Sequence, residues 1–382
     1  MRPLVIDLTC ADDERDVVHH AVQALTEGKL VALPTETVYG LAASALHEGG
    51  VARLMDVKGR SAGHPLTLAI RGGDEAHDYC PNLSRVGQRL ARRCWPGPLT
   101  LVVDASHRDS LAGRLPESVR RVVCPQGTVG LRVPDHGVLL SVLKMLAGPI
   151  VLSSANRSGQ AAAVTAAEVL AAVGKDVDLV LSDARSKYAQ PSTVVQVSGN
   201  RVSLLRTGVL TESAIRRYAS LIVLLVCTGN TCRSPMAQVL LQKHIADRLT
   251  CGIDELERCG VMVLSAGVSA ASGSPASAEA LEAMQRYGLD LTRHESRPLS
   301  DAMVRFADIV LTMTRGHREA IVTQWPEAAA RTHLLSRDNR DISDPIGGPV
   351  ETYLRCAQQI DIELQRWSHH LGLETLPEIA AG

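Results

Sequence analysis

Aromatic side chains are scarce in this sequence, which contains 3 Trp, 6 Tyr and 1 Phe among its 382 residues. Stacking platforms for bases and aromatic-walled clefts therefore cannot be common in the protein. A charge excess is also missing, because 40 basic residues oppose 41 acidic ones. This balance excludes a global electrostatic attraction to nucleic acid or to an anionic membrane, so any anion site must be local.

Long apolar runs are absent as well. No uninterrupted apolar stretch approaches the ~18 residues of a membrane span, and the first residues lack the apolar segment of an export signal. The 9 cysteines are an odd number without the paired spacing of a zinc site, and a chain of this length needs no disulfides to fold. We therefore expect a cytoplasmic protein without a membrane partner.

Composition and patterning predict two α/β domains. Hydrophobic residues make up 45% and charged residues 21%, as in globular proteins, and the length suits two domains. Strand-like and helix-like segments alternate between Gly and Pro residues. The continuous apolar run 221–226 is typical of a strand covered on both faces, and a new domain starts there. Segment 212–220 has no Gly/Ser/Pro-rich linker, so we expect closely coupled domains.

Periodicity places the elements of each half. In the first half we expect helices at 13–27, 49–58, 84–93 and 137–146 and from 165, and strands at 30–33, 66–70, 99–103, 129–133, 150–153, 180–182, 193–197 and 201–205. In the second half we expect strands at 221–226, 261–265, 309–313 and 332–335, and helices at 235–249, 277–287, 300–306 and 350–369.

A candidate anion loop follows the apolar run, with the order strand, loop, helix. It consists of Cys227, Thr228, Gly229, Asn230, Thr231, Cys232, Arg233 and Ser234. A loop at a helix N-terminus directs backbone N–H groups and the positive end of the helix dipole at one point, which suits a phosphate. The same field favours a nucleophilic thiolate at Cys227, and Arg233 can bond two phosphate oxygens. A lone strand-end cysteine is more often a core residue, but this context favours catalysis.

An acid must protonate the leaving group, and Asp344 in the turn-rich stretch 341–348 is the candidate. A loop aspartate is usually a turn former or a helix cap. Loops at the carboxyl ends of parallel strands converge, however, so Asp344 can meet Cys227 despite the long separation in sequence.

At this point the sequence resembles the low-molecular-weight protein tyrosine phosphatase family, over about 221–371. The matching pieces are VCTGNTCRSP, the SAG at 265–267, the strand at 307–313 and the Asp344-Pro345 pair. The resemblance implies a doubly wound, four-stranded parallel sheet. It also implies phosphorylated proteins as substrates, with no metal and no other cofactor.

The resemblance assigns roles to the loop as well. It implies that Cys227 forms a phosphocysteine, that Asp344 acts first as acid and then as base, and that Arg233 and the loop amides cradle the phosphate. It further implies that Asn230 and Ser234 shape the loop and stabilise the thiolate. Cys232 would be a disulfide partner for Cys227 under oxidation.

Residue 231 bears on the substrate. Tyrosine-directed members usually carry a bulky aliphatic residue there, whereas the protein arginine phosphatase subgroup carries threonine in a loop that reads CTGNTCRS, as here. Ile346 follows the Asp-Pro pair, where members of both groups carry an aromatic residue. We predict phosphoarginine as the substrate of Cys227, with phosphotyrosine as the alternative.

The first half contains a candidate nucleotide site. Lys58 and Arg60 flank a glycine just after a predicted helix, and both can reach a polyphosphate. The stretch 148–159 is a strand that enters a small-residue loop, which suits backbone and Ser/Asn contacts to a nucleotide. Taken singly, the stretch at 58–60 could also be a solvated helix end, and the Pro-Thr-Glu stretch at 34–36 could be a capped turn.

Taken together, these pieces are similar to the YrdC-like family of threonylcarbamoyl-AMP synthases, over about 8–215. The matching motifs are PTxTxYG at 34–40, KxR at 58–60, WPGPLT at 95–100, LRVP at 131–134, SAN at 154–156, STVV at 192–195 and LRxG at 205–208. Ser153 and Thr207 stand where the family commonly has proline.

This resemblance implies a twisted mixed sheet and the condensation of L-threonine, bicarbonate or CO2, and ATP to threonylcarbamoyl-AMP and pyrophosphate. It implies ATP contacts from Lys58, Arg60, Ser154, Asn156 and Arg206. It implies contacts to threonine and its carbamate from Thr35, Tyr39, His64, Thr67 and Ser192. Such a reaction needs positioned reactants and Mg2+ rather than a protein nucleophile, and we assign no protein ligands to a metal.

The two resemblances together predict a bifunctional enzyme that works beside the machinery that transfers threonylcarbamoyl groups to tRNA. Direct binding of tRNA is left open. One alternative is that the first half only binds RNA, and another is that the second half is a redox or docking module.

Overall fold

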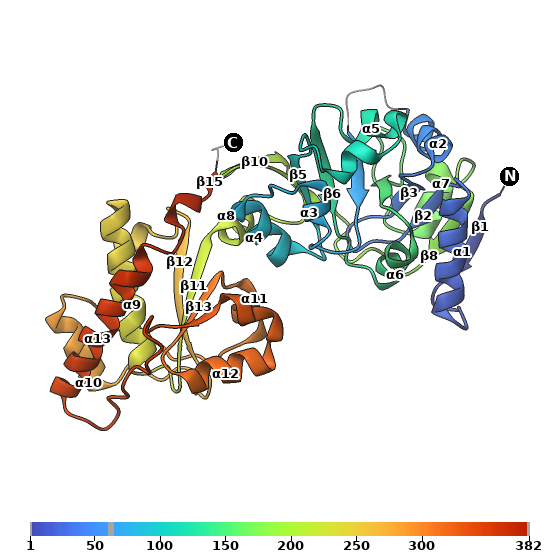
Figure 1. The fold of residues 1–382 in the computed structure, drawn as a ribbon. Helices are drawn as coiled ribbons and strands as arrows, with labels where there is room; N and C mark the ends of the chain where they lie inside the picture. Colours follow the sequence, from blue (N-terminus) through green and yellow to red (C-terminus); the bar gives the residue numbers. More distant parts are fainter. Residues whose placement is uncertain (1, 60–64, 380–382) are drawn as a thin grey trace. The chain divides into compact units, whose positions relative to one another are not determined.

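The structure is a computed structural model that describes residues 2–59 and 65–379 (Figure 1). These residues divide into two compact units. The first unit comprises the described residues up to Ile215 together with Glu378 and Ile379, and the second comprises Arg216–Pro377. The described parts of the predicted domain ranges 8–215 and 221–371 lie within these units.

Most strands belong to the first unit. Its strands are β1 (Leu4–Asp7), β2 (Val31–Leu33), β3 (Gly40–Ser44), β4 (Thr67–Ala69), β5 (Leu99–Asp104), β6 (Thr128–Arg132), β7 (Ile150–Ser154), β8 (Leu179–Ser182), β9 (Thr193–Ser198), β10 (Arg201–Arg206) and β15 (Glu378–Ile379). Its helices are α1 (Glu14–Thr26), α2 (Glu48–Lys58), α3 (Ala76–Tyr79), α4 (Arg85–Cys94), α5 (Glu117–Val123), α6 (Gly137–Met145) and α7 (Ala166–Val173).

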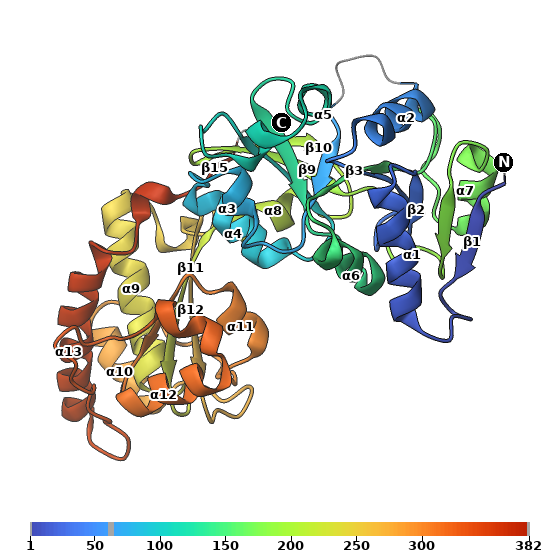
Figure 2. The same cartoon turned by 45° about the vertical axis from the view of Figure 1, so that its right-hand side comes forward.

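The strands of the first unit form one mixed sheet, which confirms the predicted fold class. Their order is β1-β8-β2-β3-β7-β4-β6-β5-β9-β10-β15. Figure 2 labels the neighbouring strands β9 and β10 of this sheet. Strand β3 is antiparallel to both of its neighbours, whereas β5 is parallel to β9. Helices α1 and α6 pack on this sheet around a core that includes Leu25, Leu139 and Leu152. Burial of these apolar side chains stabilises the layered arrangement.

The second unit alternates strands and helices. Its strands are β11 (Leu221–Cys227), β12 (Val261–Gly267), β13 (Ile309–Thr312) and β14 (Thr332–Leu334). Its helices are α9 (Arg233–Leu249), α10 (Ala278–Arg286), α11 (Asp301–Phe306), α12 (Arg315–Gln324) and α13 (Val350–Ser368), and α8 (Glu212–Ala219) spans the boundary between the units.

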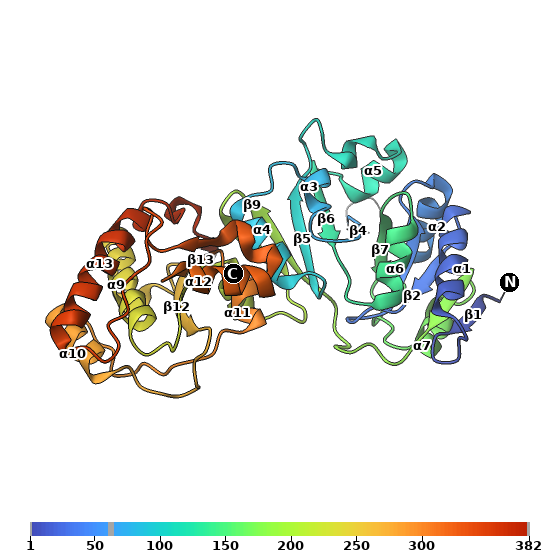
Figure 3. The same cartoon turned by 60° about the horizontal axis from the view of Figure 1, so that its bottom comes forward.

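The sheet of the second unit is parallel throughout, in the order β12-β11-β13-β14. Figure 3 labels β12 and β13 of this sheet. Alternate side chains of β11 enter two cores. Leu225 packs in the core that holds α9, α10 and α13, whereas Leu224 packs in the core that holds α11 and α12. The doubly wound four-stranded sheet is therefore confirmed. Because all four strands point the same way, the loops that follow them meet at one edge.

Some elements were not predicted from the sequence. Strand β3 consists of GLAAS, which has no β-branched residue, and it exists because both of its edges are paired in the sheet. Helix α12 buries only His317 and Ile321, so its apolar periodicity is weak. Within residues 2–59 and 65–379, no helix combines the length and the apolarity needed to cross a membrane.

Candidate active sites

The anion loop of the second unit surrounds a buried sulfur atom. Cys227 is the last residue of β11, and α9 begins six residues later at Arg233. The Cys227 Sγ atom lies 2.9 Å from Ser234 Oγ, and the backbone N–H of Asn230 donates to it over 3.2 Å. Asn230 adopts a left-handed backbone conformation with φ of 54°, which turns its N–H inward.

The side chain of Asn230 is hydrogen-bonded to the serine that lies beside that sulfur. Its Nδ2 group donates to Ser234 Oγ over 2.9 Å and to Ser265 Oγ over 3.0 Å. Its Oδ1 accepts the backbone N–H of Arg297 over 2.9 Å, which holds the amide in place. Ser234 Oγ accepts from Asn230, and its own proton can be donated to Cys227 Sγ, 2.9 Å away, or to the Ala266 carbonyl oxygen, 3.4 Å away, so the sulfur is the nearer acceptor. The network is therefore arranged to stabilise a thiolate.

Arg233 and Asp344 meet at the same loop. The Arg233 guanidinium is buried, and its terminal nitrogen pairs with the Asp344 carboxylate. The other terminal nitrogen donates to the carbonyl of Ile342 over 3.3 Å. Asp344 follows β14 in the chain, so the fold brings together the cysteine loop and the acid loop that the sequence predicted.

His317 also belongs to this site, and sequence reasoning missed it. Its Nε2 atom lies 2.9 Å from Thr228 Oγ1, and the same hydroxyl accepts from Arg233 over 3.4 Å. Burial, together with the nearby Arg233 charge, lowers the pKa of His317 to about 4, so the imidazole is neutral near pH 7. No sequence signal pointed to His317, because α12 itself was not predicted.

The neighbouring Cys232 has partners of its own. Its sulfur lies 3.5 Å from the Tyr353 hydroxyl and donates to Ser277 Oγ over 3.6 Å. Burial and the Cys232 contact raise the pKa of Tyr353 to about 12. Cys227 and Cys232 are both free thiols in this structure. Tyr353 is a second residue that the sequence did not single out.

His294 supports the loop from the other side. Its Nε2 atom lies 2.7 Å from the Asn230 carbonyl oxygen, and burial lowers the pKa of the imidazole. Thr231 is half-buried, and its backbone carbonyl accepts a hydrogen bond from the backbone N–H of Ser277 over 3.0 Å. Ile346 beside the acid is 72% exposed, so its side chain is open to a substrate.

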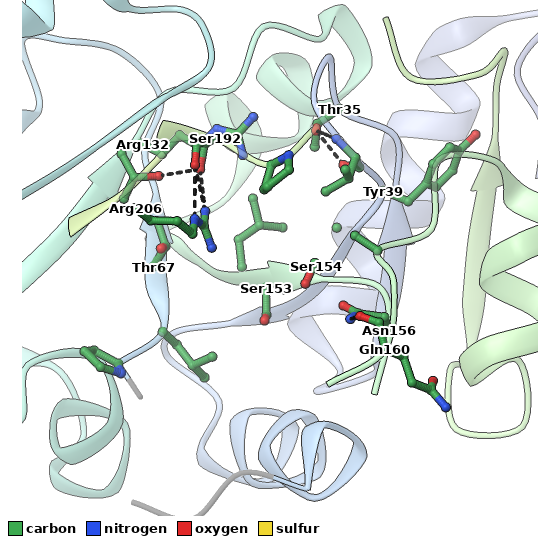
Figure 4. A pocket seen from close by; sticks show the side chains of 18 residues that line it. Thr35, Tyr39, Thr67, Arg132, Ser153, Ser154, Asn156, Gln160, Ser192 and Arg206 are labelled. Atoms are coloured by element: carbon green, nitrogen blue, oxygen red, sulfur yellow. Dashed lines mark hydrogen bonds between the residues drawn. The ribbon is translucent and has the colours of Figure 1, made fainter. Parts of the chain in front are cut away.

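The first unit contains a polar cavity of about 350 Å3 (Figure 4). Most of the predicted residues line it, namely Thr35, Tyr39, Thr67, Ser154, Asn156, Ser192 and Arg206. Further lining residues that the site prediction did not include are Thr100, Arg132, Ser153 and Gln160. The predicted contacts of Arg60 and His64 lie outside the described residues.

Lys58 supports the cavity wall. Its buried ammonium donates to the Ser154 carbonyl over 2.8 Å and to Asn156 Oδ1 over 2.9 Å. These bonds tie the end of α2 to the end of β7 and to the loop that follows it. In this structure the side chain is therefore directed at Ser154 and Asn156, two residues that line the cavity.

Two predicted threonine-binding hydroxyls already have backbone partners. The Tyr39 hydroxyl donates to the Asp183 carbonyl over 3.0 Å and accepts the Asp183 N–H over 2.9 Å. Burial raises the pKa of Tyr39. The Thr35 hydroxyl donates to the Val38 carbonyl over 2.6 Å. Both side chains thus shape the loop at 35–39 in addition to lining the cavity.

Two arginines, Arg132 and Arg206, also line the cavity. Arg206 donates through its terminal nitrogen to the Ser192 carbonyl over 2.9 Å and to Ser192 Oγ over 3.1 Å (Figure 4). Arg132 is 6% exposed and pairs with Glu36 over 2.7 Å. Its buried Nε atom has no hydrogen-bond partner among the described residues. Arg132 lies in the LRVP motif, which was the signal that could have identified it.

The fold and the two sites define a chain of two α/β enzyme domains, one with a polar cavity sized for a small ligand and one with a cysteine–arginine anion loop. A family model of the Sua5/YciO/YrdC type, described as telomere recombination, matches residues 23–208. The model for low molecular weight phosphotyrosine protein phosphatases matches residues 222–376.

Individual relatives agree with both models. A protein-arginine-phosphatase of Geobacillus stearothermophilus is 38% identical over 156 residues, which are 40% of this chain and 97% of the relative. A putative threonylcarbamoyl-AMP synthase of Mycobacterium leprae is 34% identical over 208 residues, which are 54% of this chain and 90% of the relative. The chain therefore belongs to the threonylcarbamoyl-AMP synthase family through its first unit and to the low-molecular-weight phosphatase family through its second.

A longer relative and one solved structure are also similar to this chain. The threonylcarbamoyl-AMP synthase of Pyrococcus abyssi is 34% identical over 194 residues, and the chain spans only 54% of its length. The crystal structure of P. abyssi Sua5 complexed with L-threonine has a TM-score of 0.51 at 22% identity, and the match covers 70% of this chain and 92% of that one. This last similarity concerns the fold alone.

Proposed function

We propose that the chain is a bifunctional enzyme. Its first unit would join L-threonine, bicarbonate or CO2, and ATP into threonylcarbamoyl-AMP and pyrophosphate, for the modification of tRNA. Its second unit would be a cysteine-dependent protein phosphatase, most active on phosphoarginine. Membership in the two families supports the activities, and the contacts in each site support the assigned residues. We further propose a cytoplasmic location, because Cys227 has to stay reduced to act.

The cavity of the first unit suits a reaction that depends on positioning. Arg206, Ser154 and Asn156 offer a cation and hydrogen-bonding groups for the nucleotide. The unpartnered Nε atom of buried Arg132 offers a donor for an anionic group such as the carboxylate of threonine. Holding a carbamate oxygen in line with the α-phosphate then accelerates the transfer without a protein nucleophile.

Mg2+ would enter this site with the nucleotide. Among the described residues, no group of three or more His, Cys, Asp or Glu side chains converges as a cation site. Mg2+ commonly binds through substrate phosphates and water rather than through a protein cage, which fits these surroundings. Bound there, it would neutralise charge that develops on the phosphates.

Product analysis tests the synthase. The parent protein should form threonylcarbamoyl-AMP and pyrophosphate from threonine, bicarbonate and ATP, and the variant Arg206→Gln should lose most of this activity. Lys58→Ala should lose it as well, because the loop that carries Ser154 and Asn156 loses its anchor. Binding of RNA without any threonylcarbamoyl-AMP would favour the alternative, an RNA-binding module.

In the second unit, the Cys227 thiolate would attack the phosphorus atom and form an S–P bond while the bond to the leaving group breaks. Asp344 would give its proton to that leaving group. Arg233 and the loop amides would hold the phosphoryl oxygens, where they stabilise charge in the transition state. Asp344 would then take a proton from water, which attacks phosphorus, and the thiolate would leave with the Ser234 proton hydrogen-bonded to it.

The preference for phosphoarginine rests on Thr231 and on the exposed Ile346. Thr231 is smaller than the bulky aliphatic residue of tyrosine-directed members, and Ile346 supplies no aromatic ring that could stack on a phenol. The protein-arginine-phosphatase from G. stearothermophilus is a relative that agrees with this preference. The test compares kcat/KM on phosphoarginine and phosphotyrosine peptides. A parent protein that prefers phosphotyrosine would favour the alternative, and equal activity of Cys227→Ser would contradict the mechanism.

Thr231→Ile sharpens this test. A larger aliphatic side chain should favour a flat phenol and remove a hydroxyl from the pocket, so the ratio of kcat/KM values should move toward phosphotyrosine. Thr231→Ser, which keeps the hydroxyl, is the matched control. An unchanged ratio in Thr231→Ile would refute the role of this residue.

A further inference from the structure

A second cavity of about 540 Å3 lies in the second unit, beside β14, α12 and α13, and the proposed mechanism does not use it. Its lining includes Arg315, Arg318, Glu319, His333, Arg337 and Trp367. Three arginines thus face one glutamate, although the whole chain carries a formal charge of only -1. The cavity is a local concentration of positive charge.

Two of these arginines have no acidic partner. Arg315 lies 3.4 Å from Asp341 through its Nε atom, but among the described residues no carboxylate pairs with Arg318 or Arg337. Arg318 donates through Nε to the Thr332 carbonyl over 3.0 Å. The Arg337 guanidinium lies 5.1 Å from the centre of the Trp367 ring. Both side chains are therefore held in place by contacts other than an ion pair.

The charges of Arg318 and Arg337 both act on His333. Burial and the charges of Arg318 and Arg337 lower the pKa of His333, and no carboxylate contributes to this shift. His333 is on β14, and its ring lies 5.4 Å from the Trp367 ring. Since like charges that share a cavity repel each other, a bound anion would relieve a cost already present in the fold.

This cavity adjoins the anion loop at 227–234, the phosphate loop of the proposed mechanism, through the first turn of α12. Arg315 and Arg318 line the cavity, and His317 between them lies 2.9 Å from Thr228 of the loop. One helical turn rises about 5.4 Å, and an extended peptide advances about 3.3 Å per residue. The helix residues that line the cavity and the one that contacts the loop thus lie within about one helical turn of each other, a span that about two residues of an extended peptide cover.

We propose that this cavity binds the acidic side chains that flank the phosphorylated residue of a protein substrate. Glutamate or aspartate carboxylates match the planar, forked guanidiniums of Arg318 and Arg337 in charge and in geometry. The inference rests on the proposed phosphatase activity, and it adds a sequence preference that the phosphate loop itself cannot supply.

The test uses the full chain and three substrates: p-nitrophenyl phosphate, a phosphorylated peptide flanked by glutamates, and the same peptide flanked by alanines. In the parent protein, the glutamate peptide should have the higher kcat/KM. In Arg318→Gln/Arg337→Gln this advantage should shrink about 5- to 20-fold, chiefly through KM, because two charge-assisted contacts are lost. Activity on p-nitrophenyl phosphate and on the alanine peptide should change less than about 2-fold.

The control variant is Lys243→Gln/Arg286→Gln. It removes two positive charges from exposed ion pairs on α9 and α10, and it should keep the preference for the glutamate peptide. An equal loss of preference in this control would mean that net charge alone is responsible, and the cavity proposal would be wrong. An unchanged preference in Arg318→Gln/Arg337→Gln would overturn it as well.

A competition experiment on the parent protein needs no variant. An unphosphorylated hexaglutamate peptide should inhibit hydrolysis of the glutamate-flanked peptide and leave p-nitrophenyl phosphate hydrolysis unchanged. Inhibition of both substrates, or of neither, contradicts the cavity proposal. If the parent hydrolyses no phosphorylated substrate at all, the proposed phosphatase function fails instead, so the two failures are distinguishable.

Discussion

At the residue scale, the cysteine sulfur of the phosphate loop lies beside a serine hydroxyl that is itself held by an amide. Ser234 Oγ lies 2.9 Å from Cys227 Sγ, and Asn230 orients it by donating to the same oxygen. A hydrogen bond to a charged sulfur is worth more than one between neutral groups. The reactivity of Cys227 should therefore depend on this single serine.

The variant Ser234→Ala tests this dependence. Loss of the hydroxyl should slow alkylation of Cys227 by iodoacetamide about 10-fold, because negative charge on the reacting sulfur loses a stabilising hydrogen bond. Rates of alkylation at Cys227, measured by mass spectrometry, provide the readout. Ser269→Ala removes an exposed serine that follows β12 and is the matched control. Equal rates in the two variants would contradict the assigned role.

His317 makes stability depend on pH. Its pKa is lowered to about 4 in the folded protein, so below its ordinary value near 6.5 the unfolded chain binds a proton that the folded protein does not. As the pH falls from 6.5 to 4, protonation of His317 in the unfolded chain should lower the free energy of unfolding by up to about 3 kcal/mol. Above pH 6.5 this residue should not affect the stability.

Urea denaturation of the parent and of His317→Gln checks this expectation. The amide of glutamine does not titrate, so the difference in stability between the two proteins should shift in favour of the variant as the pH falls. Asp344 and Asp341 oppose the shift of the His317 pKa, so they should be left intact in both proteins. Parallel stability curves between pH 4 and 7 would show that His317 does not titrate as described.

At the element scale, the carboxyl edge of the parallel sheet packs tightly against the phosphate loop. A Cβ atom on Gly267, the last residue of β12, would lie 2.4 Å from the Thr228 carbonyl oxygen and 2.9 Å from the Asn230 nitrogen. Both contacts are with backbone, which cannot rotate away. Only glycine at this position allows β12 and the loop to approach so closely.

Gly267→Ala should therefore displace the loop. We expect kcat on p-nitrophenyl phosphate to fall about 10- to 100-fold, since small misplacements of reacting groups have effects of that size. Gly316→Ala in α12 is the control, because a Cβ there would come no closer than 3.9 Å to a neighbouring side chain. A fully active Gly267→Ala variant would mean that the loop tolerates the shift.

Several elements could be predicted from the sequence, and others could not. The apolar run of β11, followed by a glycine, an arginine and a helix, carried its own signal because strand, loop and helix are contiguous. Helix α12 carried almost none, since it buries only His317 and Ile321. The site residues that lie on it were missed for that reason.

At the scale of the whole molecule, each unit has its own core. The residues that pack α1 and α6 on the mixed sheet are all in the first unit, and those that pack around β11 are all in the second. Each active site is built from residues of one unit only.

The two activities should consequently be separable by mutation. Cys227→Ser should abolish phosphatase activity and change threonylcarbamoyl-AMP formation less than about 2-fold, and Arg206→Gln should do the reverse, because mutations without shared partners act independently. Both activities are measured on the same preparations. A loss of synthase activity in Cys227→Ser would reveal coupling between the sites.

By itself, the sequence determined the two families and the α/β class of both halves, and it predicted the contiguous loop of Cys227 and its acid, Asp344, because a local motif such as CTGNTCRSP holds its functional groups in a few neighbouring residues. Only the tertiary structure decided the remaining partners. His317 reaches the phosphate loop because α12 begins where the parallel strands end at one edge, and Lys58 reaches Ser154 because α2 ends beside the end of β7. Such meetings depend on how strands are ordered in a sheet, which no local pattern encodes.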